Sequence, residues 1–310
     1  MRCLVTGATG VLGSSLVRLL CHRGATVAAL LRPKSDPWRL IDVLSMVEVI
    51  TGDLNAIAES EAAIKRFRPD VVCHLGWYGV GSKYRDDPGQ ITRNVTGSLE
   101  LLRIAAAAGC GRWVGLGSQA ELGPHDGVLN DSLPARPTTA YGAAKLSVGL
   151  LGEHLCAAYG MSHCWLRLLA IYGPRDEPSH LIPYVTLALL GGQSPSLSPG
   201  VQRWDYLYVD DAAEAIWQAA SQQNCSGTFF LGSGQAHTVR SIVEKVRDLI
   251  DAKSPLRFGV VPYRQDQSML LQADIGAFQA ATGWSPATSM SNGLRRTVAW
   301  FKRNRARYGP

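Results

Sequence analysis

Tyr141 and Lys145 are the residues whose types and spacing best fit acid–base chemistry. The composition after Pro137 favours a helix to about Tyr159, and residues four apart on a helix share one face. A free tyrosine has a pKa of about 10, and a lysine charge beside it favours the phenolate and lowers that pKa. The pair therefore predicts a usable general acid or base, although the same spacing also arises by chance. Ser118, at the end of a short apolar segment, suits a hydrogen bond to the oxygen that Tyr141 protonates.

A glycine motif near the N-terminus supplies a context for this pair. Residues 2–5 form an apolar run that predicts a buried strand, and an amphipathic helix pattern follows the motif. Strand, glycine turn and helix together are typical of a loop that binds a dinucleotide pyrophosphate at the helix N-terminus. We therefore expect this loop to bind the cofactor, through Gly7, Thr9, Gly10, Val11, Leu12 and Gly13.

The end of the second predicted strand indicates which dinucleotide is bound. This strand covers residues 26–31, and Arg32 follows it where NAD-selective folds usually carry an acid. The first acid after the strand is Asp36. Because an arginine here accommodates a 2′-phosphate, we expect NADP, with NAD possible. The alternative is that Arg32 is a solvated loop charge.

The bulk composition fits an ordinary α/β protein, with 310 residues, 46% apolar residues and 18% charged residues. We find no targeting leader and no run long enough to span a bilayer, so we expect a cytoplasmic protein that does not enter a membrane. The seven cysteines never occur as Cys-x-x-Cys and the seven histidines are scattered, which argues against disulfides and against any metal site. The net charge of +6 comes partly from a basic C-terminal tail, which reads as a solvated helix end rather than a nucleic-acid site.

The glycine motif, Ser118 and the Tyr141–Lys145 pair together resemble the extended short-chain dehydrogenase/reductase family, which includes nucleotide-sugar epimerases, dehydratases and ketoreductases. The resemblance covers nearly the whole chain and implies an α/β fold: a Rossmann-type doubly wound parallel sheet with a smaller, irregular C-terminal substrate-binding domain. It implies an NAD(P)-binding domain of residues 1–171, to which residues 205–235 return. Residues 172–204 and 236–310 would bind the nucleotide sugar. The helices around 94–108 and 141–159 imply a homodimer that forms through a four-helix bundle.

The resemblance also implies further cofactor contacts. Asp53 and Leu54 match residues that contact the adenine, and Leu75 and Gly76 end the fourth strand beside the cofactor. Leu169 matches the strand that closes the nucleotide-binding half. Tyr141 and Lys145 would also contact the cofactor, with the lysine on the nicotinamide ribose. His74, within the fourth strand, reads as a structural histidine.

The implied substrate residues come from several segments. The aromatic pair Trp77 and Tyr78 begins a loop that either contacts the sugar face or packs locally. Arg203 is displaced by one position from the family's phosphate-binding arginine, so Arg264 is the better match for a phosphate ligand. The full set implied to bind substrate is Trp77, Tyr78, Ser118, Gln119, His180, Leu181, Leu197, Arg203 and Arg264.

The residues after Ser118 discriminate among the reactions of the family. Its 4,6-dehydratases carry Thr-Asp-Glu where this chain has Ser118-Gln119-Ala120, and epimerases of the fucose-synthase kind carry a cysteine in place of Ala120. We therefore expect NADPH-dependent reduction of a nucleotide-linked 4-keto-6-deoxyhexose. The alternative is an NAD-dependent C4 epimerase. A redox-sensing or scaffolding nucleotide-binding protein is disfavoured, because such members typically lose the Tyr–Lys pair.

Overall fold

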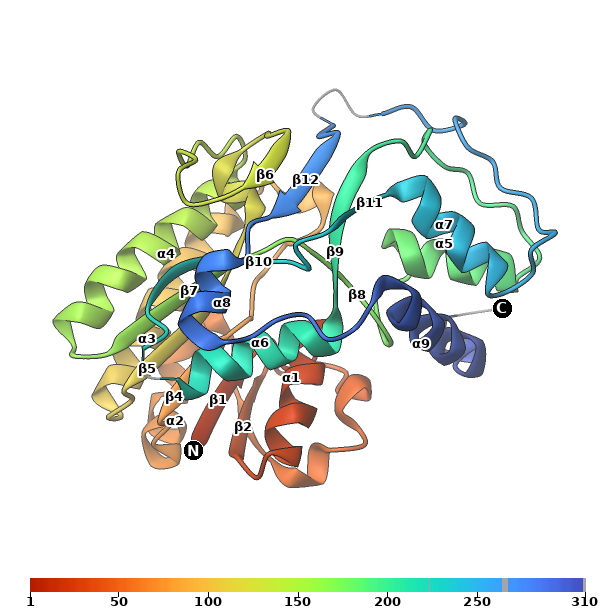
Figure 1. Cartoon of the computed structure of the whole chain (residues 1–310). Coiled ribbons are helices and arrows are strands. Elements are labelled where there is room, and N and C mark those ends of the chain that lie inside the picture. Colours follow the sequence, from red (N-terminus) through yellow and green to blue (C-terminus); the bar gives the residue numbers. More distant parts are fainter. Residues whose placement is uncertain (223, 264–266, 309–310) are drawn as a thin grey trace.

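The computed structural model describes residues 1–222, 224–263 and 267–308, and its larger sheet contains seven strands with every neighbouring pair parallel. The strand order is β3-β2-β1-β4-β5-β7-β10 (Figure 1). The order reverses beside β1, and in such sheets ligands bind at the carboxyl ends of the strands near this reversal. The strands are β1 (Arg2–Thr6), β2 (Thr26–Leu31), β3 (Val47–Thr51), β4 (Val71–His74), β5 (Arg112–Ser118), β7 (Ser162–Leu168) and β10 (Gly227–Leu231).

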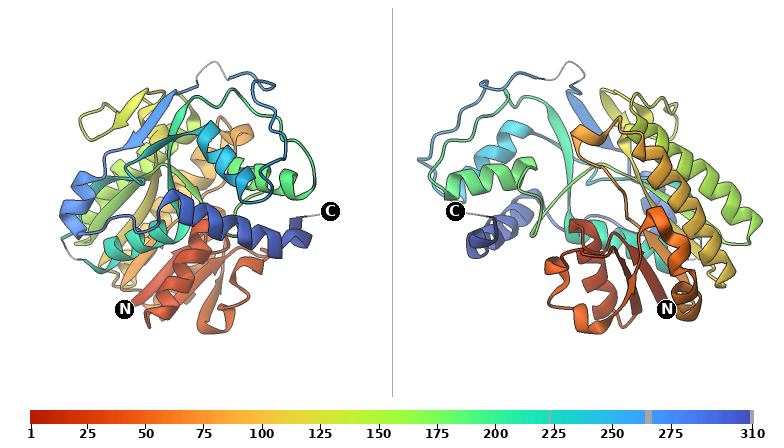
Figure 2. Two further views of the ribbon diagram at one scale, coloured as in Figure 1. Left: turned by 45° about the vertical axis from the view of Figure 1, so that its right-hand side comes forward. Right: turned by 180° about the vertical axis from the view of Figure 1, so that it is seen from behind.

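Helices cover both faces of this sheet, which explains why its strands are apolar on both sides (Figures 1 and 2). Successive side chains of β1 alternate between two cores: Cys3 and Val5 join the first, and Leu4 joins the second. The first core also contains side chains of α1 (Val11–His22) and α6 (Val209–Ser221), whereas the second contains those of α2 (Glu61–Phe67), α3 (Thr96–Ala107) and α4 (Ala140–Ala158).

A smaller sheet and further helices form the rest of the fold. Its order is β11-β9-β12-β6, and β8 also pairs with β9. Helices α5, α7 and α9 bury a third apolar cluster against β8 and β9, while α8 packs Phe278 against Phe229 of β10, with ring centroids 5.5 Å apart. The bounds are β6 (Gly127–Leu129), β8 (Ala170–Tyr172), β9 (Arg203–Tyr208), β11 (Ala236–Thr238), β12 (Leu270–Ala273), α5 (Leu181–Leu190), α7 (Val239–Asp248), α8 (Gly276–Thr282) and α9 (Met290–Arg303).

Short helical turns complete the connections between these elements. Within the described residues, six are of the 3-10 type and one, η5, is a π-helical turn that runs directly into α3. They are η1 (Trp38–Leu40), η2 (Leu44–Met46), η3 (Leu54–Ser60), η4 (Ser82–Tyr84), η5 (Gln90–Val95), η6 (Gln119–Leu122) and η7 (Arg305–Tyr308).

The expected α/β class with a doubly wound parallel sheet is confirmed. The third strand ends at Thr51, and Asp53, two residues later, is the N-cap of η3. We propose a first domain of residues 1–171 with 205–235 and a second of residues 172–204 with 236–310. One strand of the first domain, β6, pairs with β12 of the second. Within the described ranges, no helix combines the length and apolar character needed to cross a bilayer.

Candidate active site

The glycine loop after β1 is shaped by close backbone approaches. Gly7 has a φ of +68°, and a Cβ there would lie 2.7 Å from the amide nitrogen of Gly76. A Cβ on Gly13 would collide with the carbonyl of Gly7. Gly10 is the N-cap of α1, and the first helical turn contains no acid. The N-terminal amides and the helix dipole are therefore available for a pyrophosphate.

The other predicted cofactor residues follow the carboxyl ends of neighbouring strands. Parallel strands all end at one edge of a sheet, so the topology brings these residues to the edge where the glycine loop lies. They are Arg32 after β2, Asp53 and Leu54 after β3, Leu75 and Gly76 after β4, and Leu169 after β7.

Individual residues at this edge differ in what they offer a ligand. Arg32 is exposed, whereas Leu12 is 6% exposed and belongs to the first apolar core. Asp53 accepts a hydrogen bond from the amide of Asn55 at 3.0 Å and caps η3. Leu169 is 8% exposed, and its backbone amide donates a hydrogen bond to the carbonyl of Leu231 at 3.0 Å.

Ser118, Tyr141 and Lys145 come together where β5 ends against α4. Their exposed fractions are 8%, 6% and 4%, so all three belong to the protein interior. Thr139 caps α4 by accepting a hydrogen bond from the amide of Gly142 at 3.1 Å, which fixes the helix start just before Tyr141. The structure therefore assembles the three residues expected to carry the chemistry.

The charges around Tyr141 differ from the sequence-based expectation. Burial raises the pKa of Tyr141, while a hydrogen bond with Ser118 and the charge of Arg85 act to lower it. The Lys145 ammonium donates to the carbonyl of Leu116 at 2.6 Å. The expected net lowering of the Tyr141 pKa is therefore wrong for this structure, because burial prevails, and Arg85 is a cation that acts to lower it.

Lys145 itself is strongly affected by its surroundings. Its Nζ lies 3.7 Å from the ring centroid of Trp77, a cation–π contact. Burial lowers the pKa of Lys145 to about 7, and the charge of Glu121 opposes that decrease. The ammonium therefore sits close to its titration point at neutral pH.

The loop after β4 places its two aromatic side chains differently. Trp77 donates to the side-chain oxygen of Gln90 at 2.8 Å, and its ring meets that of Tyr141 edge-on at 6.2 Å. Tyr78 donates to Asp87 at 3.3 Å and thus packs within its own loop. Of the two alternatives, local packing therefore holds for Tyr78, whereas Trp77 contacts both Tyr141 and Lys145.

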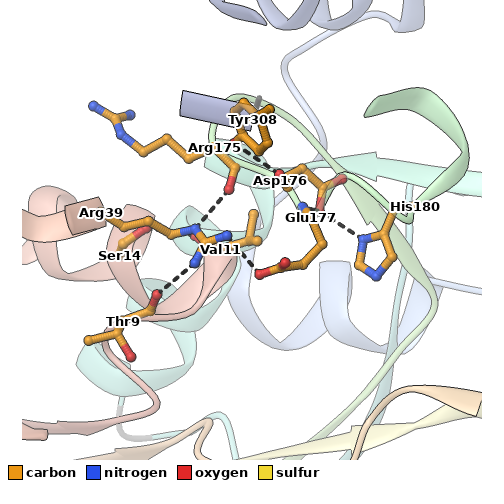
Figure 3. A network of polar contacts seen from close by, with 9 residues as sticks. All are labelled: Thr9, Val11, Ser14, Arg39, Arg175, Asp176, Glu177, His180 and Tyr308. Carbon is orange, nitrogen blue, oxygen red and sulfur yellow. Dashed lines mark hydrogen bonds and ion pairs between the residues drawn. The ribbon is translucent and has the colours of Figure 1, made fainter. Parts of the chain in front are cut away.

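A buried arginine joins the glycine loop to the segment after β8 (Figure 3). Arg39 is 9% exposed and donates to the carbonyl of Arg175 at 2.8 Å and to that of Thr9 at 3.3 Å. It also pairs with Glu177 at 2.7 Å. The predicted cofactor-binding loop and a segment of the predicted substrate region therefore contact the same guanidinium.

His180 lies in the same network and is the N-cap of α5 (Figure 3). Its Nδ1 lies 2.8 Å from the carboxylate of Asp176, which is 1% exposed. This hydrogen bond raises the pKa of His180 and favours its cation. A cation beside helix N-terminal amides suits the predicted contact with a pyrophosphate.

The remaining predicted substrate residues are spread over several elements. Gln119 begins η6 directly after Ser118 and is half-buried. Leu197 is 5% exposed within the third apolar cluster, and the half-buried Leu181 packs against that cluster. Arg203 is exposed and donates to the carbonyl of Ala236 at 3.2 Å. The predicted phosphate ligand Arg264 lies outside the described residues.

Comparison with known proteins decides the family. The model of the NAD dependent epimerase/dehydratase family matches residues 3–232. The chain belongs to this family. It is therefore an enzyme of the extended short-chain dehydrogenase/reductase type, as the sequence motifs indicate.

The reported relatives match nearly the whole length of the chain. A dTDP-glucose 4,6-dehydratase of Neisseria gonorrhoeae is 25% identical over 98% of this chain and 96% of its own. A UDP-glucose 4-epimerase of Corynebacterium glutamicum is 28% identical over 92% of this chain and 91% of its own. Among solved structures, the UDP-glucose 4-epimerase of Thermus thermophilus in complex with NAD has a TM-score of 0.86 at 26% identity, covering 97% of this chain and 99% of that one.

Three side chains of the site escaped the sequence interpretation. Arg85 reaches Tyr141 from a loop and has no sequence signature, and Arg39 follows β2 among several other charges. Glu121 did have a signal, because a serine followed three residues later by a glutamate is a capping-box pattern, and the structure contains that box with Ser118.

Proposed function

We propose that this enzyme reduces a nucleotide-linked 4-keto-6-deoxyhexose with NADPH. A bound NADPH would supply the hydride for the keto carbon, and Tyr141 would protonate the alkoxide that develops there. Ser118 donates a hydrogen bond to the same oxygen, and Lys145 holds the nicotinamide ribose. The buried cluster of these three side chains supports the assignment.

The observation that carries the proposal is the lack of acids at the two positions that follow Ser118. Water elimination needs further acid–base groups beside the reacting carbons. The positions that would supply them are Gln119 and Ala120. Glu121 does not replace them, because it is 0% exposed and its carboxylate is paired with Arg167 at 2.8 Å. Reduction and epimerisation at one carbon need only the groups that are present.

NADPH is proposed on the basis of Arg32, an exposed cation at the end of β2. The alternative function, C4 epimerisation with a retained NAD, is favoured by the relatives named as UDP-glucose 4-epimerases and by the solved structure with NAD. The two functions differ in whether the cofactor is consumed. A reductase oxidises added NADPH, whereas an epimerase keeps its NAD.

The test incubates the protein with NADPH and a panel of 4-keto-6-deoxy nucleotide sugars that differ in nucleotide, and follows the absorbance of the nicotinamide. We expect substrate-dependent oxidation of NADPH, with a loss of about 100-fold or more in Tyr141→Phe. Purified protein that carries NAD, converts UDP-sugars and leaves NADPH unchanged would establish the epimerase instead.

Arg32→Ala tests the coenzyme assignment separately. We expect it to reduce the preference for NADPH over NADH, because it removes the cation predicted to meet the 2′-phosphate. Arg66→Ala, an exposed arginine on α2, is the matched control and should keep the preference. An unchanged preference in Arg32→Ala would remove the NADP assignment.

We also propose a cytoplasmic homodimer that pairs α3 and α4 of two subunits. Leu150 and Leu151 on α4 support it, since they are 53% and 44% exposed. Leu150→Asp should shift the mass measured by light scattering from dimer to monomer.

A further inference from the structure

The Glu121 carboxylate is buried next to the backbone of Ser118. Glu121 is 0% exposed, and it accepts hydrogen bonds from the backbone amide of Ser118 at 2.8 Å and from the indole nitrogen of Trp165 at 3.0 Å. Arg167 on β7 donates to its second oxygen at 2.8 Å. Three N–H donors converge on one side chain, and a carboxylate, whose two oxygens only accept, matches this donor set.

The sequence of β5 makes room for this carboxylate. A Cβ on Gly117 would lie 2.5 Å from Oε1 of Glu121 and would also collide with the Trp165 indole. A Cβ on Gly115 would collide with the same indole. Glycine inside a strand weakens it, so two glycines here indicate that the close approach of these side chains is required.

Glu121 and Lys145 are both held at the end of β5, since Lys145 donates to the carbonyl of Leu116 at 2.6 Å and Glu121 accepts the amide of Ser118, two residues further on, at 2.8 Å. Burial drives the pKa of Lys145 down to about 7, and Glu121 is the group that opposes this decrease. The other titratable or charged groups at the site are His74 on β4, Tyr141 one helical turn away and Arg85 near the Tyr141 ring. Only Glu121 among these is an anion.

We propose that Glu121 and Arg167 form a positioning pair of the active site, in which Glu121 fixes the main chain of Ser118 and supplies the buried negative charge that keeps Lys145 an ammonium. Arg167 partly neutralises Glu121 and so limits the strength of that charge. The proposal deepens the proposed function, since it concerns the same Ser118–Tyr141–Lys145 site and rests on it.

The test reads the charge of Lys145 in the free enzyme, without cofactor or sugar. Protein with carbon-13 at the lysine Cε is titrated by NMR, and the Lys145 resonance is assigned from its absence in Lys145→Met. We expect Glu121→Gln, which keeps the shape but removes the charge, to lower the titration point of Lys145 by about half a pH unit or more. Arg167→Gln should shift it in the opposite direction, because Glu121 is then less neutralised.

The opposite signs separate this role from simple structural support. Damage to the fold would shift both variants in the same direction, and Arg167→Gln alone carries the test if Glu121→Gln does not fold. Glu121→Asp, which restores a carboxylate, should recover part of the shift. Glu214→Gln, which removes the surface pair with Arg23, is the matched control and should leave both the titration and the activity unchanged.

Titration of Lys145 at the same pH in wild type and both variants would overturn the proposal. Because this measurement uses no substrate, a failed reductase assay leaves it intact. Where activity is found, the pH limb of kcat assigned to Lys145 should move in parallel with the NMR titration.

Discussion

His74 offers the clearest quantitative test of this structure, because it is buried, neutral and placed at the edge of the sheet where the glycine loop lies. It is 1% exposed, and its ring nitrogens lie 2.9 Å from the Thr6 hydroxyl and 2.8 Å from the Ser98 hydroxyl. The Thr6 oxygen in turn accepts the amide of Gly76 at 2.9 Å. The histidine thus ties the end of β4 to the end of β1 and to α3. We choose His74→Gln, which retains hydrogen-bonding capacity but does not titrate.

The magnitude follows from proton linkage. Burial, assisted by the Lys145 charge, lowers the pKa of His74 from 6.5 to about 3. The native state therefore stays unprotonated where the unfolded state binds a proton, so the free energy of unfolding falls as the pH falls below about 6.5. Between about pH 7 and about pH 5, this single group removes about 2 kcal/mol of stability.

The assay is urea unfolding followed by tryptophan fluorescence at both pH values. Wild type should lose about 2 kcal/mol more than His74→Gln over this interval, whatever the stability of the variant at neutral pH. His22→Gln, at the exposed end of α1, is the control and should keep the wild-type pH dependence. Equal losses in wild type and His74→Gln would refute the argument that His74 is held neutral by burial.

Three further predictions follow from other parts of the structure. Gly13→Ala should weaken cofactor binding and lower the free energy of unfolding by about 1–3 kcal/mol, because the added Cβ would collide with the Gly7 carbonyl. Fluorescence titration measures the binding, and urea unfolding measures the stability. Gly111→Ala, which places its Cβ in open space, is the control and should change neither. Arg85→Gln should move the basic limb of the pH–rate profile to higher pH, because the Arg85 charge lowers the pKa of the Tyr141 acid; a stationary limb contradicts this. His163→Leu should raise the free energy of unfolding at pH 7 by about 1 kcal/mol, because neither ring nitrogen of His163 has a hydrogen-bond partner among the described residues. The gain should be larger at pH 5, because burial lowers the pKa of His163 to about 4 and the wild type loses stability as the pH falls. Calorimetric melting at both pH values measures the gain, and equal stabilities of variant and wild type would disprove the prediction.

The sequence by itself determined the parts of this enzyme that depend on local rules. The glycine loop is readable because Gly7 has a positive φ, which favours glycine, and because close backbone contacts leave no room for a Cβ at Gly7 or Gly13. Tyr141 and Lys145 are readable because helical periodicity places them on one face. Ser118 and Arg32 are readable because each follows or ends a short apolar strand pattern, and the resemblance of these motifs to the family implied the doubly wound sheet.

Tertiary structure alone decided the charges at the site. Helical spacing put Lys145 beside Tyr141, yet packing turns the ammonium to Trp77 and Leu116, and the loop residue Arg85 takes its place near the phenol. The links between Glu121 and Arg167, and between Arg39 and the glycine loop, join segments far apart in the chain. No local pattern encodes these approaches, because burial and the distance between charges exist only once the sheet and its helices have packed.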